Sequence, residues 1–170
     1  MMRIFLIFCL VLVSVTLPAQ EVSDIRRQYT ESVRDEGKCK ALYEKLFADK
    51  NIKDPVILGY KGAVAMVMAK YVSSPLSKLS YFKEGKELLE SAIKKSPQNL
   101  ELHFIRFGIQ ENLPSILMYN ENLNEDKKFI IQHLDEVDRP KFKQSIISFL
   151  LKSENVTESE KAELRKLEAK

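Results

Sequence analysis

The sequence predicts an all-α protein of about seven to eight helices, arranged as stacked antiparallel helical hairpins. Apolar residues recur at helical spacing from residue 22 to the C-terminus, whereas the alternation typical of strands never extends beyond a few residues. The helical segments are joined by short turns that carry Pro, Ser, Asp or Asn. Helices joined by short turns pack as antiparallel neighbours, which is why a hairpin stack is expected.

The N-terminus has the three parts of a cleavable signal peptide. Arg3 precedes an apolar run over residues 4–17, and small residues follow at 18–20. We expect residues 1–19 to be removed after Ala19 and the chain to be exported, either to the periplasm or out of the cell. As a helix the run would be about 21 Å long, too short to span a bilayer core of roughly 30 Å.

The remaining chain is expected to fold mainly as one domain. Residues 20–152 form the predicted helical domain, and residues 153–170 form a charged C-terminal helix that docks loosely. Cys9 lies inside the apolar run, which argues against a lipid anchor, and it is lost with the signal. Cys39 is then the sole cysteine, so no internal disulfide can form and stability depends on apolar packing.

The charge of the chain does not indicate a nucleic-acid partner. There are 27 Lys and Arg against 24 Asp and Glu, with both signs interspersed. The densest basic pairs, at 94–95 and 127–128, lie at or near expected helix ends and have acidic neighbours. We therefore expect a solvated surface without the basic patch that binds phosphate backbones.

Two helices are expected before residue 50. Ser23 is the predicted cap of the first helix, and Gly37 is predicted to break it. The apolar positions of this first helix are Val22, Ile25, Tyr29 and Val33. The second helix has a stripe of Cys39, Leu42 and Leu46, so Cys39 is interpreted as a buried, inert thiol rather than a reactive one.

The stretch from residue 54 to residue 72 predicts a buried helix. Asp54 is the expected cap and Pro55 the first helical residue. Lys61 near the front of this apolar run favours a buried helix over a membrane span. A further helix is expected from Pro75 to Lys95, with its apolar face at Leu79, Phe82, Leu89, Ala92 and Ile93.

The helix expected over residues 100–112 carries the candidate binding residues. Four polar side chains fall within about 60° of one another on its helical wheel: Asn99, His103, Arg106 and Gln110. In one interpretation this stripe lines a groove, where Arg106 grips a carboxylate and Tyr60 or Tyr119 stacks against a ligand. In the other it faces solvent, or forms an internal network in which Arg106 pairs with a neighbouring Glu.

The last third of the chain predicts a short helical piece and three helices. The short piece runs from Pro114 to Tyr119, and Asn124 is the expected cap of the next helix. Glu125 and Asp126 are interpreted as first-turn residues that complement its dipole. The expected buried positions are Ile130, Leu134 and Val137 in that helix, then Phe142, Ile146, Phe149 and Leu150 after Pro140. Thr157 and Glu160 match the capping box of a final helix.

One part of the chain resembles a tetratricopeptide (TPR) repeat. Ala92, Pro97 and the helix opening at Asn99 resemble the end of one unit and the start of the next, and Gly62-Ala63 resembles the small residues of a first helix. The resemblance covers residues 56–112, and no second copy occurs at the family's period. It implies a short right-handed superhelix whose concave face binds peptides or proteins. The layout also resembles that of small exported helical proteins of Bacteroidetes-type bacteria.

The sequence offers no set of residues for a catalytic, metal or cofactor site. Two histidines, His103 and His133, and one retained cysteine are too few for a transition-metal cluster. The five glycines are scattered and form no phosphate-binding loop. Carboxylates around 121–126 and 135–138 are interpreted as solvated helix ends. We therefore expect no catalytic residues, no metal and no cofactor.

The function expected from the sequence is that of an exported protein or peptide interaction module. Its predicted partner is a protein or peptide, with no nucleic acid and no membrane span once the signal is removed. Two alternatives stay open: a small hydrolase or ligand-binding enzyme on a helical scaffold, and a structural subunit of an envelope complex. The sequence does not fix the oligomeric state.

Overall fold

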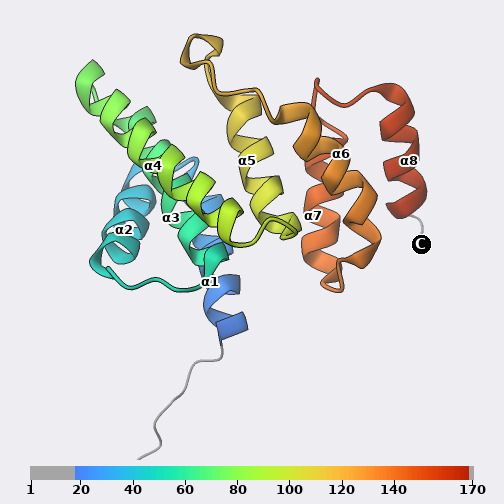
Figure 1. The fold of residues 1–170 in the computed structure, drawn as a ribbon, viewed down its shortest axis with the longest axis horizontal. Coiled ribbons are helices and arrows are strands. Elements are labelled where there is room, and N and C mark those ends of the chain that lie inside the picture. The colour runs from blue at the N-terminus through green and yellow to red at the C-terminus, as the bar shows by residue number, and fades with distance from the viewer. Residues whose placement is uncertain (1–17, 169–170) are drawn as a thin grey trace, which may run out of the picture.

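The computed structural model describes residues 18–168, which form eight α-helices and two short 3-10 turns without any strand (Figure 1). The predicted signal peptide lies outside these residues, apart from its last two. The helices are α1 (Pro18–Ser32), α2 (Glu36–Ala48), α3 (Pro55–Tyr71), α4 (Pro75–Lys95), α5 (Leu100–Asn112), α6 (Leu123–His133), α7 (Pro140–Leu150) and α8 (Glu158–Glu168). The 3-10 turns are η1 (Ser115–Leu117) and η2 (Leu134–Glu136). The predicted all-α class and the packing of successive helices are confirmed.

Several helices begin where the sequence predicts. The Asp54 carboxylate accepts hydrogen bonds from the backbone N–H groups of Val56 at 2.7 Å and Ile57 at 3.2 Å. Asn99 caps α5 through a 3.2 Å bond from the N–H of Leu102. The capping box before α8 is also formed, because the Thr157 N–H donates to Glu160 at 2.8 Å and the Glu160 N–H donates back. Each cap satisfies backbone donors that a helix start leaves unpaired.

The first two helices have different boundaries from those predicted. Since α1 begins at Pro18, Ser23 lies inside the helix and is not its cap. Asp35 caps α2 by accepting a 2.9 Å bond from the N–H of Lys38, so Gly37 lies within α2 and does not break a helix. Val33 falls after the last residue of α1 and is exposed, not buried. The predicted cap at Asn124 is also wrong, because α6 already includes Leu123.

The α3–α4 hairpin is packed unusually closely. A Cβ atom placed on Gly62 would lie 2.6 Å from the Gly85 carbonyl oxygen and 2.8 Å from the Leu89 backbone nitrogen. Only residues without a Cβ allow the two backbones to approach this far. Within residues 18–168 no helix is both long and apolar enough to cross a membrane.

The apolar side chains form two clusters that meet at α5. The first cluster joins α1 to α5, and the second joins α5 to α8. Leu102 and Ile105 of α5 belong to the first cluster, whereas Phe107 belongs to the second. In Figure 1, α5 accordingly lies between α3 and α4 on one side and α6 and α7 on the other. The helix that carries the candidate residues is therefore the central one.

The C-terminal helix contributes to the second cluster. Leu164 of α8 is fully buried, and Val156 just before α8 is also buried. The rest of α8 is largely exposed and rich in charge.

Candidate functional site

The polar side chains of α5 lie inside the molecule. His103, Arg106 and Gln110 are all buried, and Asn99 is half-buried at the start of the helix. Tyr60 and Tyr119 are buried as well. The arrangement is the internal network that was one of the two interpretations of the sequence, and that these residues contact a ligand stays a prediction.

Asp126 of α6 is the centre of the first network. Its two carboxylate oxygens accept bonds of 2.7 Å each from Nε and one Nη of Arg106. The Asp126 side chain has no exposed surface, so the interpretation of this residue as part of a solvated helix end is wrong. A bidentate pair between Arg and a carboxylate is both strong and directional. It fixes the position of α6 against α5.

His103 is held in its protonated form by the same network. Its Nε2 lies 2.9 Å from the carbonyl oxygen of Pro97, which can only accept a hydrogen bond. Its Nδ1 lies 2.6 Å from the Asp126 oxygen that also accepts a bond from Arg106. Both ring nitrogens therefore donate. Burial lowers the pKa of His103, but the bonds to Asp126 and Pro97 outweigh burial and raise it overall.

Glu90 of α4 extends the network toward the loop after α5. It accepts a 2.8 Å bond from Arg106 and a short bond from the hydroxyl of Tyr119. Burial and the neighbouring Glu90 raise the pKa of Tyr119, so its phenol stays protonated and keeps donating. Lys86 places its ammonium 4.5 Å from the centre of the Tyr119 ring. Arg106 thus connects α4, α5 and α6.

Glu101 is the centre of a second network, on another face of α5. Its carboxylate accepts bonds from Arg26 of α1 at 2.8 and 2.9 Å, and from Arg139 just before α7 at 3.1 Å. The Tyr60 hydroxyl donates to it at 2.8 Å. Both guanidinium groups also lie 4.5 Å from the centre of the Phe142 ring. The Glu101 carboxylate thus binds two arginines, one from each half of the molecule.

Sequence reasoning missed both buried carboxylates, although a signal for them exists. Asp126 precedes Ile130 and Leu134 by four and eight positions and so shares their buried face. Glu101 precedes the buried Ile105 and Ile109 by the same intervals. A carboxylate in line with buried apolar residues needs a cationic partner.

Both carboxylates at the network centres are satisfied by partners within the molecule. Every partner of Asp126 and Glu101 described above is a side chain of the same molecule. Gln110 has no hydrogen-bond partner for its amide within the described part of the chain. Among residues 18–168 no group of three or more His, Cys, Asp or Glu could hold a metal ion. Cys39 is buried as predicted, and burial with the nearby Glu36 raises its pKa to about 11, which keeps the thiol protonated.

Most of the exposed large apolar residues of the described chain lie elsewhere, on two segments that we call the apolar end of the molecule. Four large side chains form it: Leu76 and Leu79 on the first turns of α4, and Ile116 and Met118 in the loop after α5. Leu76, Ile116 and Met118 are more than 80 % exposed, at 81, 85 and 82 %. The prediction that Leu79 is buried is wrong, because the start of α4 extends beyond its neighbours (Figure 1).

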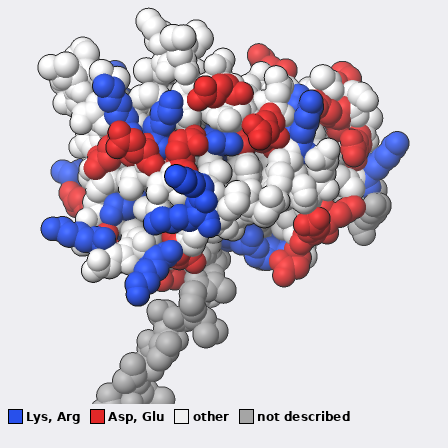
Figure 2. Space-filling model, in the orientation of Figure 1, with Lys and Arg blue, Asp and Glu red and all other residues white. Residues whose placement is uncertain are grey.

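The two segments are connected at their base. The Phe82 and Tyr119 rings meet edge to face, with their centres 5.9 Å apart. In Figure 2 two projections composed mainly of uncharged residues rise at this end of the molecule, separated by a notch.

Comparison with known proteins adds no relationship. No known protein family, curated protein or solved structure matches this chain.

Proposed function

We propose that this chain is an exported, non-catalytic interaction module that binds a peptide segment of a partner protein at its apolar end. The observation that carries the proposal is the exposure of four large apolar side chains on two segments at one end of the molecule. Single exposed apolar residues are ordinary, but a group of them on a soluble domain marks an interaction site. The stacked helices are compatible with the TPR-like superhelix that the sequence resembles, and peptide binding is that family's role.

The charge around the apolar end favours an acidic partner. Lys78 lies between the two exposed leucines on α4 and Lys83 lies one turn after Leu79, and neither has a side-chain partner among the described residues. The first turn of α4 contains no acidic residue that would offset the positive end of its helix dipole. The partner segment therefore combines large apolar side chains with flanking Asp or Glu.

The backbone conformation of the loop after α5 supports the proposal that this loop presents the Met118 side chain to a partner. Met118 has a φ of 46° and a ψ of 44°, the left-handed conformation that residues with a Cβ rarely adopt. Its side chain nevertheless points into solvent. Keeping a non-glycine residue there costs about 1 kcal/mol or more, and the largely exposed side chain gains little packing in return. Strained residues of this kind concentrate at functional sites.

Peptide selection tests the proposal directly. Random dodecapeptides displayed on phage would be selected on the immobilised chain that starts at Gln20, and the affinity of synthetic winners would be measured by fluorescence anisotropy. We expect winners that combine large apolar residues with Asp or Glu. Leu76→Ser and Ile116→Ser should each weaken binding by more than about tenfold, as is typical of central interface residues.

Met118→Gly separates binding from folding. Glycine relieves the left-handed strain, so this variant should fold at least as stably as the wild type and still bind more weakly. Lys50→Gln, far from the apolar end in the loop after α2, is the control and should bind as the wild type does. Winners without apolar residues, or unchanged affinity in both serine variants, would overturn the proposal. So would binding of anionic phospholipid vesicles at this end in the absence of any selected peptide.

A further inference from the structure

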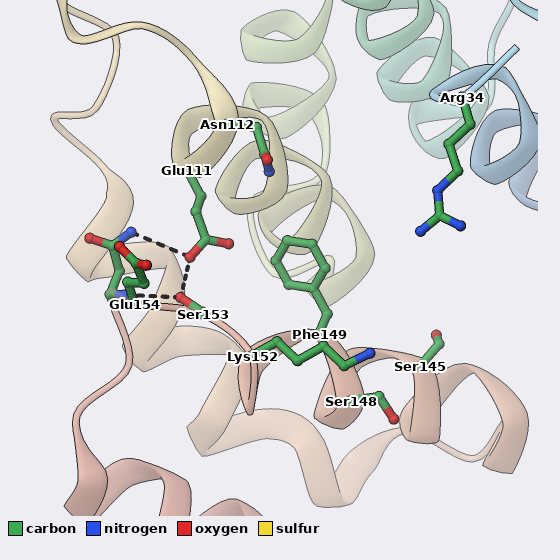
Figure 3. A pocket seen from close by; sticks show the side chains of 10 residues that line it. Arg34, Glu111, Asn112, Ser145, Ser148, Phe149, Lys152, Ser153 and Glu154 are labelled. Atoms are coloured by element: carbon green, nitrogen blue, oxygen red, sulfur yellow. Dashed lines mark hydrogen bonds between the residues drawn. The ribbon is translucent and has the colours of Figure 1, made fainter.

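An open cleft lies at the seam between the two halves of the molecule (Figure 3). Its volume is about 630 Å³, within the range of small-molecule sites. Arg34, which follows α1, forms one wall, and α7 and the residues after it form the opposite wall. The end of α5 closes the cleft between them. This cleft is separate from the apolar end, since none of the four exposed apolar residues lines it.

Phe149 divides the cleft into a basic and an acidic side. Figure 3 shows the Arg34 guanidinium and the Lys152 ammonium on one side of the Phe149 ring, together with the hydroxyl of Ser148. Glu111 and Glu154 lie on the other side. One carboxylate oxygen of Glu111 accepts bonds from Ser153 and Asn155.

The two cations in this cleft are without partners. No side-chain hydrogen bond or ion pair joins Arg34 or Lys152 to another residue of the described chain. The Ser148 hydroxyl makes no hydrogen bond to a described residue either. Two unpaired cations and a hydroxyl group on one side of the cleft provide donors for an anion.

At the other end of the same seam, a pair of cations binds one carboxylate of the chain. There Arg26 of α1 and Arg139 before α7 both hold the carboxylate of Glu101, and both lie over the Phe142 ring. At the open end, Arg34 and Lys152 likewise come one from each side of the seam, and both line the cleft together with Phe149. The carboxylates that line this cleft, Glu111 and Glu154, form no ion pair with either cation within the described residues.

The geometry points to a site for the C-terminal carboxylate of a short peptide, held between Arg34 and Lys152 with its last side chain against Phe149. The two acidic residues across the ring disfavour a doubly charged phosphate and favour a ligand whose ammonium group faces them. A cleft of this volume accommodates two or three residues. The ligand class is therefore a short peptide with both ends free and an apolar or aromatic C-terminal residue.

Binding of matched dipeptides tests this site. Gly-Phe, its C-terminal amide and its N-acetyl form would be titrated into the ¹⁵N-labelled chain that starts at Gln20. We expect Gly-Phe to bind with a Kd on the order of 1 mM and to shift amide signals near Phe149 and Lys152. The amide should bind at least about tenfold more weakly because it loses the charged group. The N-acetyl form should lose less affinity than the amide, because the acidic side of the cleft is open to solvent.

Two charge variants complete the test. Arg34→Gln and Lys152→Gln should each weaken binding of Gly-Phe by about tenfold and leave binding of the amide unchanged. Lys50→Gln is the matched control, because Lys50 lines another open cleft beside Phe47 and the substitution removes the same charge. Equal affinity for Gly-Phe and its amide, or wild-type affinity in Arg34→Gln, would overturn the assignment. Either result would leave the peptide-selection test of the apolar end unaffected.

Discussion

The α3–α4 contact and the α5–α6 contact are held by different physical means. At the first, Gly62 and Gly85 bring two backbones so close that a Cβ on Gly62 would lie 2.6 Å from a carbonyl oxygen. At the second, Arg106 and Asp126 join the helices by two bonds of 2.7 Å. Close packing fixes a distance and tolerates no added atom, whereas a buried ion pair fixes register and tolerates no lost charge. The two contacts should therefore fail under opposite kinds of substitution.

The strongest way to break the charged contact is Asp126→Asn. This change leaves the buried His103 without a counter-charge and Arg106 with Glu90 as its remaining carboxylate partner, and loss of one partner of a buried pair costs about 3–5 kcal/mol. The free energy of unfolding from urea denaturation measures the effect. A loss below about 1 kcal/mol would show that the network is not important for stability.

Glu101→Gln tests whether the cost of removing a buried carboxylate depends on how exposed its partners are. Its partners Arg26 and Arg139 are 19 % and 48 % exposed, so water can hydrate them when the carboxylate is removed. We expect a smaller loss, about 1.5–3 kcal/mol, measured under the same urea conditions. An equal or larger loss than in Asp126→Asn would contradict the account, because it would mean that solvent access does not decide the cost.

Gly62→Ala breaks the closely packed contact. The new methyl group meets the backbone of α4, and overpacking of this kind costs about 1–3 kcal/mol despite the better helix propensity of alanine. Gly108→Ala is the matched control, since a Cβ there lies an ordinary 3.7 Å from the Phe149 ring. That variant should be stabilised by about 0.5–1 kcal/mol. Thermal unfolding of both variants checks the sign, and destabilisation of both would refute the steric explanation.

His103 gives the smallest predicted effect, a dependence of stability on pH. The pKa of His103 is raised in the folded state. The stability that its interactions contribute is therefore fully present below the unfolded pKa of about 6.5, and this contribution is lost as pH rises through the folded pKa. The slope over that interval is at most about 1.4 kcal/mol per pH unit. Urea unfolding of the wild type and of His103→Gln at several pH values isolates the contribution. Identical pH profiles would show that His103 is not held protonated.

Much of the fold could be predicted because local chemistry determines it. Asp54, Asn99 and the Thr157–Glu160 box start helices through hydrogen bonds to neighbouring residues, so sequence alone is sufficient. The α1–α2 boundary was missed because Asp35 competes with Gly37 for the same turn and provides the stronger cap. Leu79 has the helical spacing of the buried residues of α4, but it is exposed because this part of α4 extends beyond the neighbouring helices. The exposure of a residue such as Leu79 depends on tertiary contacts, which local sequence does not encode.

The site was harder to predict for a related reason. The helical wheel places His103 and Arg106 on one stripe, but their shared partner Asp126 is 20 positions beyond Arg106 on another helix. A first-turn carboxylate that interacts with its own helix dipole has the same local sequence as one that pairs across an interface. The open cleft combines residues from 34 to 155, and no local pattern connects them.

Hydrogen exchange in the native state tests most directly whether α5 joins two separately packed cores. We predict that amides of α3 and α4 exchange only through global unfolding, and that α6 to α8 open at a free energy lower by at least about 1 kcal/mol. Asp126→Asn should lower the opening free energy of α6 to α8 further. Equal opening free energies for the α3–α4 hairpin and for α6 to α8, in the wild type and in Asp126→Asn, would contradict the account.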